Sequence, residues 1–194
     1  MIAGLLLAAG RSTRFSGDKL VAPLRGRPVL SWSARTLAAE VDALHVVVPP
    51  DTPARVAALE GSNAVIVEHA GRDAGMASSI AAGIASLPRE VEAVVVGLAD
   101  QPGISATTVR RLCDHWRAGG AAAVVPRYRD GRGHPVLFAR STFAALASLS
   151  GDAGARAVLD ALGDEVAMVS MDGERPLDVD TPDVLRALEA AWQR

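Results

Sequence analysis

The sequence has a single cysteine and few aromatic residues, and the shortage of cysteine excludes some kinds of site. Its 194 residues include one cysteine, Cys113, which excludes an intrachain disulfide and a cysteine-rich metal site. Aromatic residues make up 4%, charged residues 22% and hydrophobic residues 49%, a balance that is ordinary for a soluble globular protein. We expect Cys113 to lie inside a helix as a small hydrophobic residue, and we expect the protein to be cytoplasmic.

Two further absences argue against nucleic-acid and membrane partners. The net charge is −2, so the chain has no overall basic field of the kind that nucleic-acid binders use. No apolar stretch approaches the length of a membrane-spanning helix. The first apolar run does not have the pattern of a signal peptide, because its positive charges follow the run. We therefore expect neither nucleic acid nor a membrane as a partner.

Short β-branched apolar runs alternate with helical patterns through most of the chain. This alternation predicts an α/β fold, with a mostly parallel sheet covered by helices on both faces of one domain spanning residues 1–194. The pattern becomes irregular after Pro126. Strands are predicted at 2–8, 44–48, 64–67, 93–98, 121–125, 135–138 and 166–170. Helices are predicted at 28–40, 52–59, 78–87, 105–117, 141–149, 153–162 and from 182 to Trp192.

Helix starts are marked by proline and by residues with short polar side chains. Pro28 is expected at the first position of its helix, where the missing N–H group costs no hydrogen bond. Side-chain oxygens are expected to cap later helices by accepting hydrogen bonds from free backbone N–H groups. The predicted capping residues are Thr52, Ser78, Ser105, Asp152 and Thr181.

The segment LLLAAGRSTRFSGDKL at 5–20 combines a strand end, a tight turn of small residues and several cations. The small residues at 8–10 let the backbone approach a ligand, and Gly10 can adopt a positive φ without steric cost. Backbone N–H groups in such a turn can bind an anion, and nearby cations can neutralise phosphate charge. The cations are Arg11, Arg14 and Lys19. The segment predicts a nucleotide triphosphate site, and the alternative is a strand end followed by a solvated basic loop.

The glycine spacing of this segment excludes two common phosphate-binding motifs. A Walker-type loop needs G-x-x-x-x-G-K-[ST], whereas Gly10 and Gly17 are too far apart and Lys19 is followed by Leu20. A dinucleotide fingerprint needs G-x-G-x-x-G, which the residues after Gly10 do not supply.

Two acidic positions are candidates for a metal site. Asp100 follows the predicted buried strand 93–98, and Asp180 precedes the last predicted helix. Mg²⁺ prefers oxygen ligands and keeps several waters, so one or two carboxylates together with substrate phosphates suffice. Each carboxylate has a structural alternative, because Asp100 could bond to its own turn and Asp180 could help to begin the helix.

Three segments, 8–19, 99–102 and 178–181, are expected at strand ends, where ligands bind in sheets of this kind.

Two polar turns are further candidates. Hydroxyl and backbone groups around Ser79 could contact a nucleobase, beside a helix-capping role for Ser78. His134 lies in a flexible turn and could be an ordinary surface residue. The sequence offers it no Cys/His partner for a zinc site.

Together these segments resemble the MobA-like nucleotidyltransferases, and most closely the MocA-type molybdenum cofactor cytidylyltransferases. The resemblance runs in the family's order along nearly the whole chain, and it implies a three-layer α/β/α fold. Its mostly parallel, Rossmann-like sheet would be of the nucleotide-diphospho-sugar transferase type. The matching stretches are LAAGRSTRFSGDKL at 7–20, GMASSI at 75–80, LADQP at 98–102, RGHPVLF at 132–138, SGDAGAR at 150–156 and DVDTPDVL at 178–185.

The resemblance also implies a reaction and the residues that serve it. A phosphate oxygen of molybdopterin would attack the α-phosphorus of CTP in line, and pyrophosphate would leave in a Mg²⁺-dependent step. Arg14, Lys19 and Asp100 would be catalytic, Asp100 and Asp180 would hold the metal, and His134 would face the acceptor. The residues implied in nucleotide binding are Leu7, Ala8, Ala9, Gly10, Arg14, Lys19, Ser79 and Asp100.

Other functions on the same scaffold stay open. A guanylyltransferase, or another NTP transferase with a different acceptor, would keep the chemistry and change a substrate. An oxidoreductase is a second alternative, although the sequence carries no dinucleotide fingerprint and no flavin signature. A third is a carrier of molybdenum cofactor that hands it to a molybdoenzyme or a chaperone in a transient contact. A pure carrier, however, would have little use for a triphosphate site.

Overall fold

A computed structural model describes residues 1–15, 17–71, 75–151 and 154–192. In these residues one mixed sheet has the strand order β10-β7-β9-β6-β1-β4-β5, with β8 paired to β7, and β2 and β3 form a separate hairpin. The strands are β1 Ile2–Leu7, β2 Pro23–Leu24, β3 Arg27–Pro28, β4 Ala43–Val48, β5 Val65–Glu68, β6 Ala93–Leu98, β7 Ala123–Tyr128, β8 Gly131–Arg132, β9 Val136–Ala139 and β10 Val166–Ser170.

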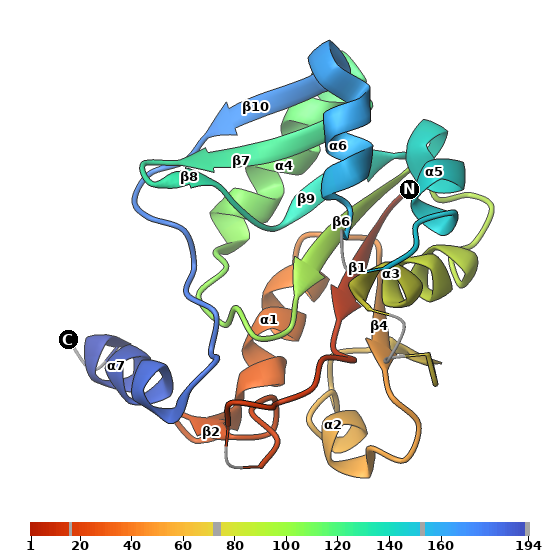
Figure 1. The fold of residues 1–194 in the computed structure, drawn as a ribbon. Coiled ribbons are helices and arrows are strands. Elements are labelled where there is room, and N and C mark those ends of the chain that lie inside the picture. Colours follow the sequence, from red (N-terminus) through yellow and green to blue (C-terminus); the bar gives the residue numbers. More distant parts are fainter. Residues whose placement is uncertain (16, 72–74, 152–153, 193–194) are drawn as a thin grey trace.

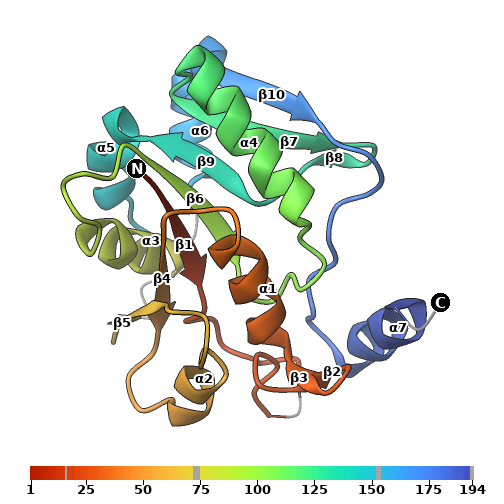
Figure 2. The same cartoon turned by 180° about the vertical axis from the view of Figure 1, so that it is seen from behind.

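Helices cover both faces of the sheet, which confirms the predicted three-layer α/β/α architecture. On one face lie α1 (Val29–Ala38) and α4 (Ala106–Gly119), seen in Figure 2. On the other lie α3 (Met76–Ala85), α5 (Phe143–Ala147) and α6 (Arg156–Leu162), in front of the sheet in Figure 1. Beyond the carboxyl ends of the central strands lie α2 (Pro53–Ala57) and α7 (Pro182–Trp192), and α7 packs beside the β2–β3 hairpin.

Most of the sheet is parallel, and one inserted strand explains the irregular pattern after Pro126. β1 pairs in parallel with β4 and β6, and β4 pairs in parallel with β5. β9 runs antiparallel between β6 and β7, so the chain turns back once before β10 pairs in parallel with β7. The simple strand–helix alternation therefore ends where this reversal begins.

Two apolar clusters, one on each side of the sheet, hold the layers together. Leu5 and Leu6 of β1 are fully buried in different clusters, because successive side chains of a strand point to opposite faces. Helix α3 approaches β1 very closely, since a Cβ added at Gly83 would lie 2.3 Å from a methyl carbon of Leu5. Cys113 lies inside α4 as expected, and burial raises the pKa of its thiol to about 11.

Two of the predicted helix caps are confirmed. Ser105 Oγ accepts a hydrogen bond from the backbone N–H of Thr108 at 3.0 Å. Thr181 Oγ1 accepts one from Val184 N–H at 3.4 Å, at the start of α7. The predicted cap Asp152 lies outside the described residues.

Three other predicted helix starts are wrong in detail. Pro28 immediately precedes α1 and does not occupy its first position. Thr52 precedes α2, but its hydroxyl donates to the carbonyl of Pro49 at 2.7 Å and makes no cap. Ser78 lies inside α3, which begins two residues earlier, after Gly75 at φ 84°. Glycine tolerates this left-handed conformation, so the chain can enter the helix sooner than the serine predicts. None of the helices in the described part of the chain is long and apolar enough to cross a membrane.

Candidate active site

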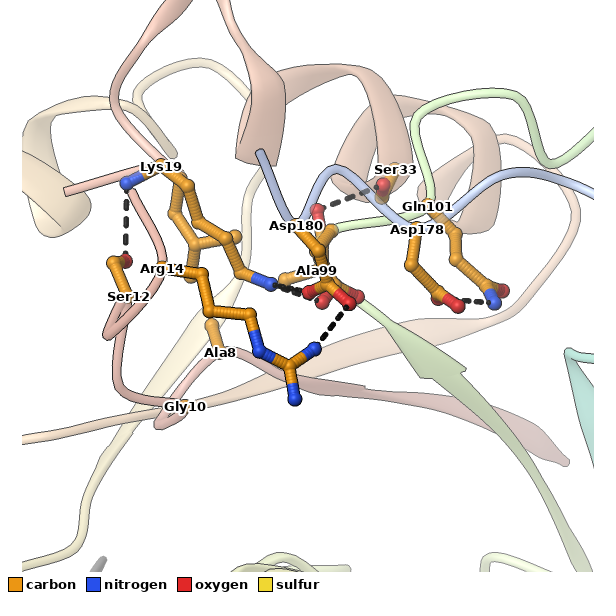
Figure 3. A network of polar contacts seen from close by, with 12 residues as sticks. Ala8, Gly10, Ser12, Arg14, Lys19, Ser33, Ala99, Gln101, Asp178 and Asp180 are labelled. Carbon is orange, nitrogen blue, oxygen red and sulfur yellow. Dashed lines mark hydrogen bonds and ion pairs between the residues drawn. The ribbon is translucent and has the colours of Figure 1, made fainter. Parts of the chain in front are cut away.

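The carboxyl ends of β1 and β6 bring the first two predicted segments together. Leu7 and Leu98 are register partners, and Ala99 N–H donates to the carbonyl oxygen of Leu7 at 3.1 Å. The turn at 8–10 and Asp100 therefore leave the sheet side by side. Helix α1 supports this edge, because Ser33 Oγ donates to the carbonyl of Ala99 at 3.2 Å (Figure 3).

The third predicted segment reaches the same place by another route. The expectation that 178–181 follows a strand end is wrong, because β10 ends at Ser170 and residues 171–181 form no strand. This irregular segment returns to β6, where Val179 N–H donates to the carbonyl of Asp100 at 2.8 Å. This hydrogen bond brings Asp180 beside Asp100.

Lys19 is the centre of the charged cluster that results. Its Nζ donates to Asp100 Oδ2 and to Asp180 Oδ1, both at 2.7 Å, and the residue is only 8% exposed (Figure 3). Arg14 is exposed, and its Nη1 lies 3.7 Å from Asp180 Oδ2. The structure therefore brings together all four charged residues that the sequence predicted for catalysis or metal binding.

Hydrogen bonds and charges favour the ionised forms of Lys19 and Asp180. Burial alone would lower the pKa of Lys19, but the hydrogen bonds and negative charges of Asp100 and Asp180 outweigh it and raise the pKa above the usual 10.5. The hydrogen bond from Lys19 in turn lowers the pKa of Asp180 below 3.8, with a further contribution from Arg14. A buried ammonium between two carboxylates is the arrangement expected where full charges are needed at neutral pH.

The two carboxylates also suit a divalent cation. Asp100 and Asp180 each contact Lys19 Nζ through one oxygen at 2.7 Å, and each carboxylate has a second oxygen that can serve as a metal ligand. These are hard oxygen donors, which Mg²⁺ and Mn²⁺ prefer. Within the described residues, no group of three or more His, Cys, Asp or Glu side chains could hold a metal. A metal here would therefore depend on phosphate oxygens and water for its other ligands.

A cavity of about 380 Å³ opens beside this cluster. Gly10 does not use the positive φ that glycine permits, and a Cβ added there would meet nothing within 4 Å, so the missing side chain leaves space beside the turn. Ala8 is fully buried behind the cavity wall. The lining includes most of the predicted nucleotide-binding residues, namely Leu7, Ala9, Gly10, Lys19, Ser79 and Asp100.

The two serines of α3 differ in their surroundings. Ser79 is 5% exposed and lines the cavity. Ser78 is turned to the preceding loop, where its hydroxyl can donate to the carbonyl of Gly71 at 2.8 Å or of Gly75 at 2.9 Å. Its Oγ also lies 3.0 Å from His69 Nε2. Of the two serines, only Ser79 is placed to contact a ligand in this cavity.

Sequence reasoning missed Arg55, the most heavily bonded cation near the site. It belongs to the short helix α2, is 5% exposed, and forms a two-pronged ion pair with Asp18. Its guanidinium also donates to the carbonyl oxygens of Ala8 and Gly10. An arginine in a short helix of five residues looks like a surface residue, so the sequence carries no signal for these contacts.

A second cavity, of about 620 Å³, adjoins the first and shares Leu7, Met76 and Leu98 with it. His134 lines this cavity, and its predicted role toward an acceptor stays a prediction. Its floor is apolar, and its polar residues include Asp130, Arg132, Arg156, Asp160, Arg175 and Asp178. Two cavities that share wall residues suit a reaction between two bound molecules.

Polar atoms in the second cavity are left without partners. Gln101 Nε2 donates to Asp178 Oδ1 at 2.8 Å, but Gln101 Oε1 and His134 Nδ1 are buried with no hydrogen-bond partner among the described residues. Burial raises the pKa of Asp178 and lowers that of His134. His134 is therefore a neutral imidazole at pH 7, able to hydrogen-bond a ligand without carrying charge.

The fold and the two joined cavities define an α/β nucleotidyltransferase of the nucleotide-diphospho-sugar transferase fold. More specifically, the chain belongs to the MobA-like NTP transferase domain family, which matches residues 4–166. The resemblance found in the sequence is thereby confirmed at the level of the family.

Individual relatives carry different activities. The chain is 36% identical to nicotine blue oxidoreductase of Paenarthrobacter nicotinovorans, over 81% of each chain. It is 35% identical to molybdenum cofactor guanylyltransferase of Cereibacter sphaeroides, over 68% of this chain and 65% of that one. Among solved structures it resembles Rv0371c of Mycobacterium tuberculosis H37Rv, with 35% identity, 97% coverage of both chains and a TM-score of 0.83. A complex of Rv0371c with manganese matches with a TM-score of 0.81.

Proposed function

We propose that this protein transfers CMP from CTP to the phosphate of molybdopterin and releases pyrophosphate. One observation supports this proposal above the others. Lys19 Nζ lies between the carboxylates of Asp100 and Asp180 at 2.7 Å from each, and Lys19 and Asp100 line the first cavity, which adjoins the second. This is a charged centre suited to phosphates, with room for a nucleotide on one side and an acceptor on the other.

In this proposal the first cavity takes the nucleotide. The small residues at 8–10 give the triphosphate access to the backbone N–H groups of the turn, and Ser79 contacts the base or the ribose. Lys19 and the more exposed Arg14 stabilise negative charge on the transferring and leaving phosphates. Catalysis then consists mainly of positioning and charge neutralisation.

Asp100 and Asp180 would hold a divalent cation, which we propose to be Mg²⁺. When bound, such an ion neutralises phosphate charge and makes the α-phosphorus a better electrophile. The carboxylates come from two separate segments, and both accept a hydrogen bond from Lys19. The manganese complex of Rv0371c supports a metal in proteins of this kind.

The second cavity would take the acceptor, with His134 beside it. A phosphate oxygen of the acceptor forms a bond to the α-phosphorus of CTP, and the bond between this phosphorus and the bridging oxygen to the β-phosphate breaks. Pyrophosphate leaves with the bonding electron pair. The attacking phosphate oxygen is already an anion at neutral pH, so no side chain has to act as a general base. A neutral His134 agrees with this requirement.

A matrix of nucleotides and acceptors tests the proposal. Pyrophosphate release is measured with CTP, GTP, ATP and UTP, each with and without molybdopterin, in the presence of Mg²⁺. We expect release with CTP only when molybdopterin is present. A preference for GTP would favour the second candidate, a guanylyltransferase, which the similarity to the Cereibacter sphaeroides enzyme supports. No release with any nucleotide would overturn both candidates.

Two further alternatives have their own tests. The relative from Paenarthrobacter nicotinovorans is an oxidoreductase, so oxidation of NAD(P)H with nicotine blue, and a bound flavin spectrum, should both be sought. A carrier would bind molybdenum cofactor tightly and release no pyrophosphate. We place the proposed reaction in the cytoplasm, with the product passed to a molybdoenzyme or its chaperone in a transient contact.

A further inference from the structure

Helix α2 reverses the usual pattern of burial. Its apolar residue Val56 is 38% exposed, whereas its charged residue Arg55 is only 5% exposed. A buried guanidinium destabilises the folded state unless its charge is paired and its N–H groups are hydrogen-bonded. The contacts of Arg55 therefore indicate why a charged side chain is held at this place.

Arg55 directs its N–H groups to two parts of segment 5–20. Its Nε donates to Asp18 Oδ2 at 2.6 Å and its Nη2 to Asp18 Oδ1 at 3.0 Å, a two-pronged pair of the kind that arginine makes with a carboxylate. The same Nη2 donates to the carbonyl of Gly10 at 3.2 Å, and Nη1 donates to the carbonyl of Ala8. One side chain thus holds the turn that follows β1 and the residue that precedes Lys19.

These contacts fix the direction of the backbone N–H groups in the turn. In a trans peptide the C=O group of one residue and the N–H group of the next point in opposite directions. Because the carbonyl of Ala8 is directed at Arg55, the N–H group of Ala9 is directed away from it. The same holds for the peptide that follows Gly10. Ala9 and Gly10 line the first cavity, so Arg55 holds the turn from behind while the opposite face is presented to the ligand.

Asp18 extends this control to the backbone of Lys19. Its Oδ1, paired with Arg55, also accepts a hydrogen bond from Leu20 N–H at 3.1 Å. Lys19 N–H donates to Ser12 Oγ at 3.0 Å, and that hydroxyl lies 3.4 Å from Asp18 Oδ1. The backbone is therefore held at and just after Lys19, whose side chain projects to Asp100 and Asp180.

We propose that Arg55 is the positioning residue of the triphosphate site. It does not touch the nucleotide. Instead, it holds the turn at 8–10 and the backbone of Lys19 in their binding geometry before the nucleotide arrives. This inference rests on the proposed function, which assigns the turn and Lys19 to the triphosphate.

The chain offers a matched control for Arg55. Arg110 of α4 makes the same two-pronged pair with Glu40, at 3.0 and 2.7 Å, but it is largely exposed and lines neither cavity. Substituting lysine at either position keeps the charge and removes the planar fork. Arg55→Lys should weaken nucleotide binding, whereas Arg110→Lys should leave it unchanged.

The test uses two measurements on the full chain, with wild type, Arg55→Lys, Asp18→Asn and Arg110→Lys. The first is hydrogen exchange of backbone amides without ligand. Arg55→Lys should speed exchange within 7–20 and leave the central strands unchanged. Asp18→Asn should act mainly on 18–20, because the contacts of Arg55 with Ala8 and Gly10 remain. If Arg55→Lys instead exchanged its amide hydrogens faster throughout the chain, Arg55 would have a general structural role and the inference would be overturned.

The second measurement is calorimetric titration with CTP and with inorganic tripolyphosphate, both in Mg²⁺. We expect Arg55→Lys to weaken the binding of both ligands by about tenfold or more, because small displacements of binding groups reduce affinity by large factors. The KM for the acceptor should stay within about twofold, because the second cavity has no contact with Arg55. Equal affinity in wild type and Arg55→Lys would overturn the inference and leave the proposed function standing. A wild type that binds neither CTP nor tripolyphosphate would overturn both.

Discussion

The two cavities share three wall residues but differ in how far the protein satisfies its own polar groups. Around the first cavity, Lys19 is bonded to two carboxylates, and Asp18 is bonded to Arg55. In the second cavity, Gln101 Oε1 and His134 Nδ1 are buried without a hydrogen-bond partner among the described residues. We interpret the first cavity as set in its working geometry beforehand, and the second as completed by its ligand.

The difference follows from what each side has to recognise. A triphosphate is recognised by its charge, which fixed cations and N–H groups can match in advance. An acceptor is selected by hydrogen bonds. A site with buried, unpaired polar atoms binds a molecule that hydrogen-bonds to those atoms and rejects molecules that do not. The contrast predicts that substitutions in the two cavities will affect different kinetic constants.

A large effect is expected for Lys19→Met. This substitution removes the cation between Asp100 and Asp180, so two carboxylates face each other and the phosphates lose a positive partner. We expect kcat/KM to fall by a factor of roughly 10²–10³ or more, as when one charge-stabilising group of an active site is removed. Pyrophosphate release under saturating Mg²⁺ measures this loss. Retention of most of the activity would contradict the role given to Lys19.

A smaller and more selective effect is expected for Gln101→Leu. Gln101 lines the second cavity but not the first, and its Nε2 donates to Asp178 while its Oε1 is buried without a partner among the described residues. We expect KM for the acceptor to rise about tenfold, the cost of one buried hydrogen bond, with KM for CTP unchanged. Val65→Thr, at an exposed position of β5, is the control. An equal rise in the KM values for the acceptor and for CTP would contradict the distinction between the two cavities.

Lys19 can also be observed directly, because it is the only lysine of the chain. Protein labelled with ¹⁵N-lysine has one side-chain ammonium signal. Its titration should give a pKa above the usual 10.5, and Asp180→Asn should lower this value. Because the folded pKa is raised, the pairing stabilises the fold fully below the unfolded pKa and ceases to do so as pH rises through the folded pKa. A pKa below 10.5 in wild type would contradict the two-carboxylate contact.

The smallest effect is expected for His134→Asn, whose stability should depend on pH differently from that of wild type. Burial lowers the pKa of this imidazole below 6.5, so the unfolded chain binds a proton more readily than the folded chain. Stability should therefore fall as pH decreases through about 6.5, and this component should be absent in His134→Asn. Burial also lowers the pKa of His45, but this contribution to the pH dependence of stability is the same in both proteins. Thermal unfolding of the two proteins between pH 5 and 8 measures the difference, and parallel curves would contradict it.

Much of the fold could be predicted from the sequence because its signals are local. The apolar run of β1, the small turn after it and Asp100 after β6 are each contained in a few consecutive residues. Parallel strands bring such segments to one edge by topology alone, so their meeting also follows. The antiparallel insertion of β9 has no comparable local signal, because strand direction depends on partners that are distant in sequence.

The rest of the site depends on contacts between distant segments. Asp180 lies in an irregular stretch that forms no strand, and it is held by the backbone bond from Val179 to Asp100 and by the hydrogen bond from Lys19. Arg55 belongs to a five-residue helix whose other residues face solvent more than core. Its four contacts lie 37 to 47 positions away in the sequence, so neither periodicity nor a motif could reveal them.

The metal-binding and transfer role of Asp100 is tested most directly by pyrophosphate release from CTP and molybdopterin, measured for Asp100→Asn beside wild type. The substitution removes one carboxylate charge but leaves Lys19 bonded to Asp180, so the thermal midpoint should change by only a few degrees. We predict that wild type releases pyrophosphate and that Asp100→Asn, still folded, releases essentially none. Turnover near the wild-type rate in the folded variant would contradict the metal site and the mechanism built on it.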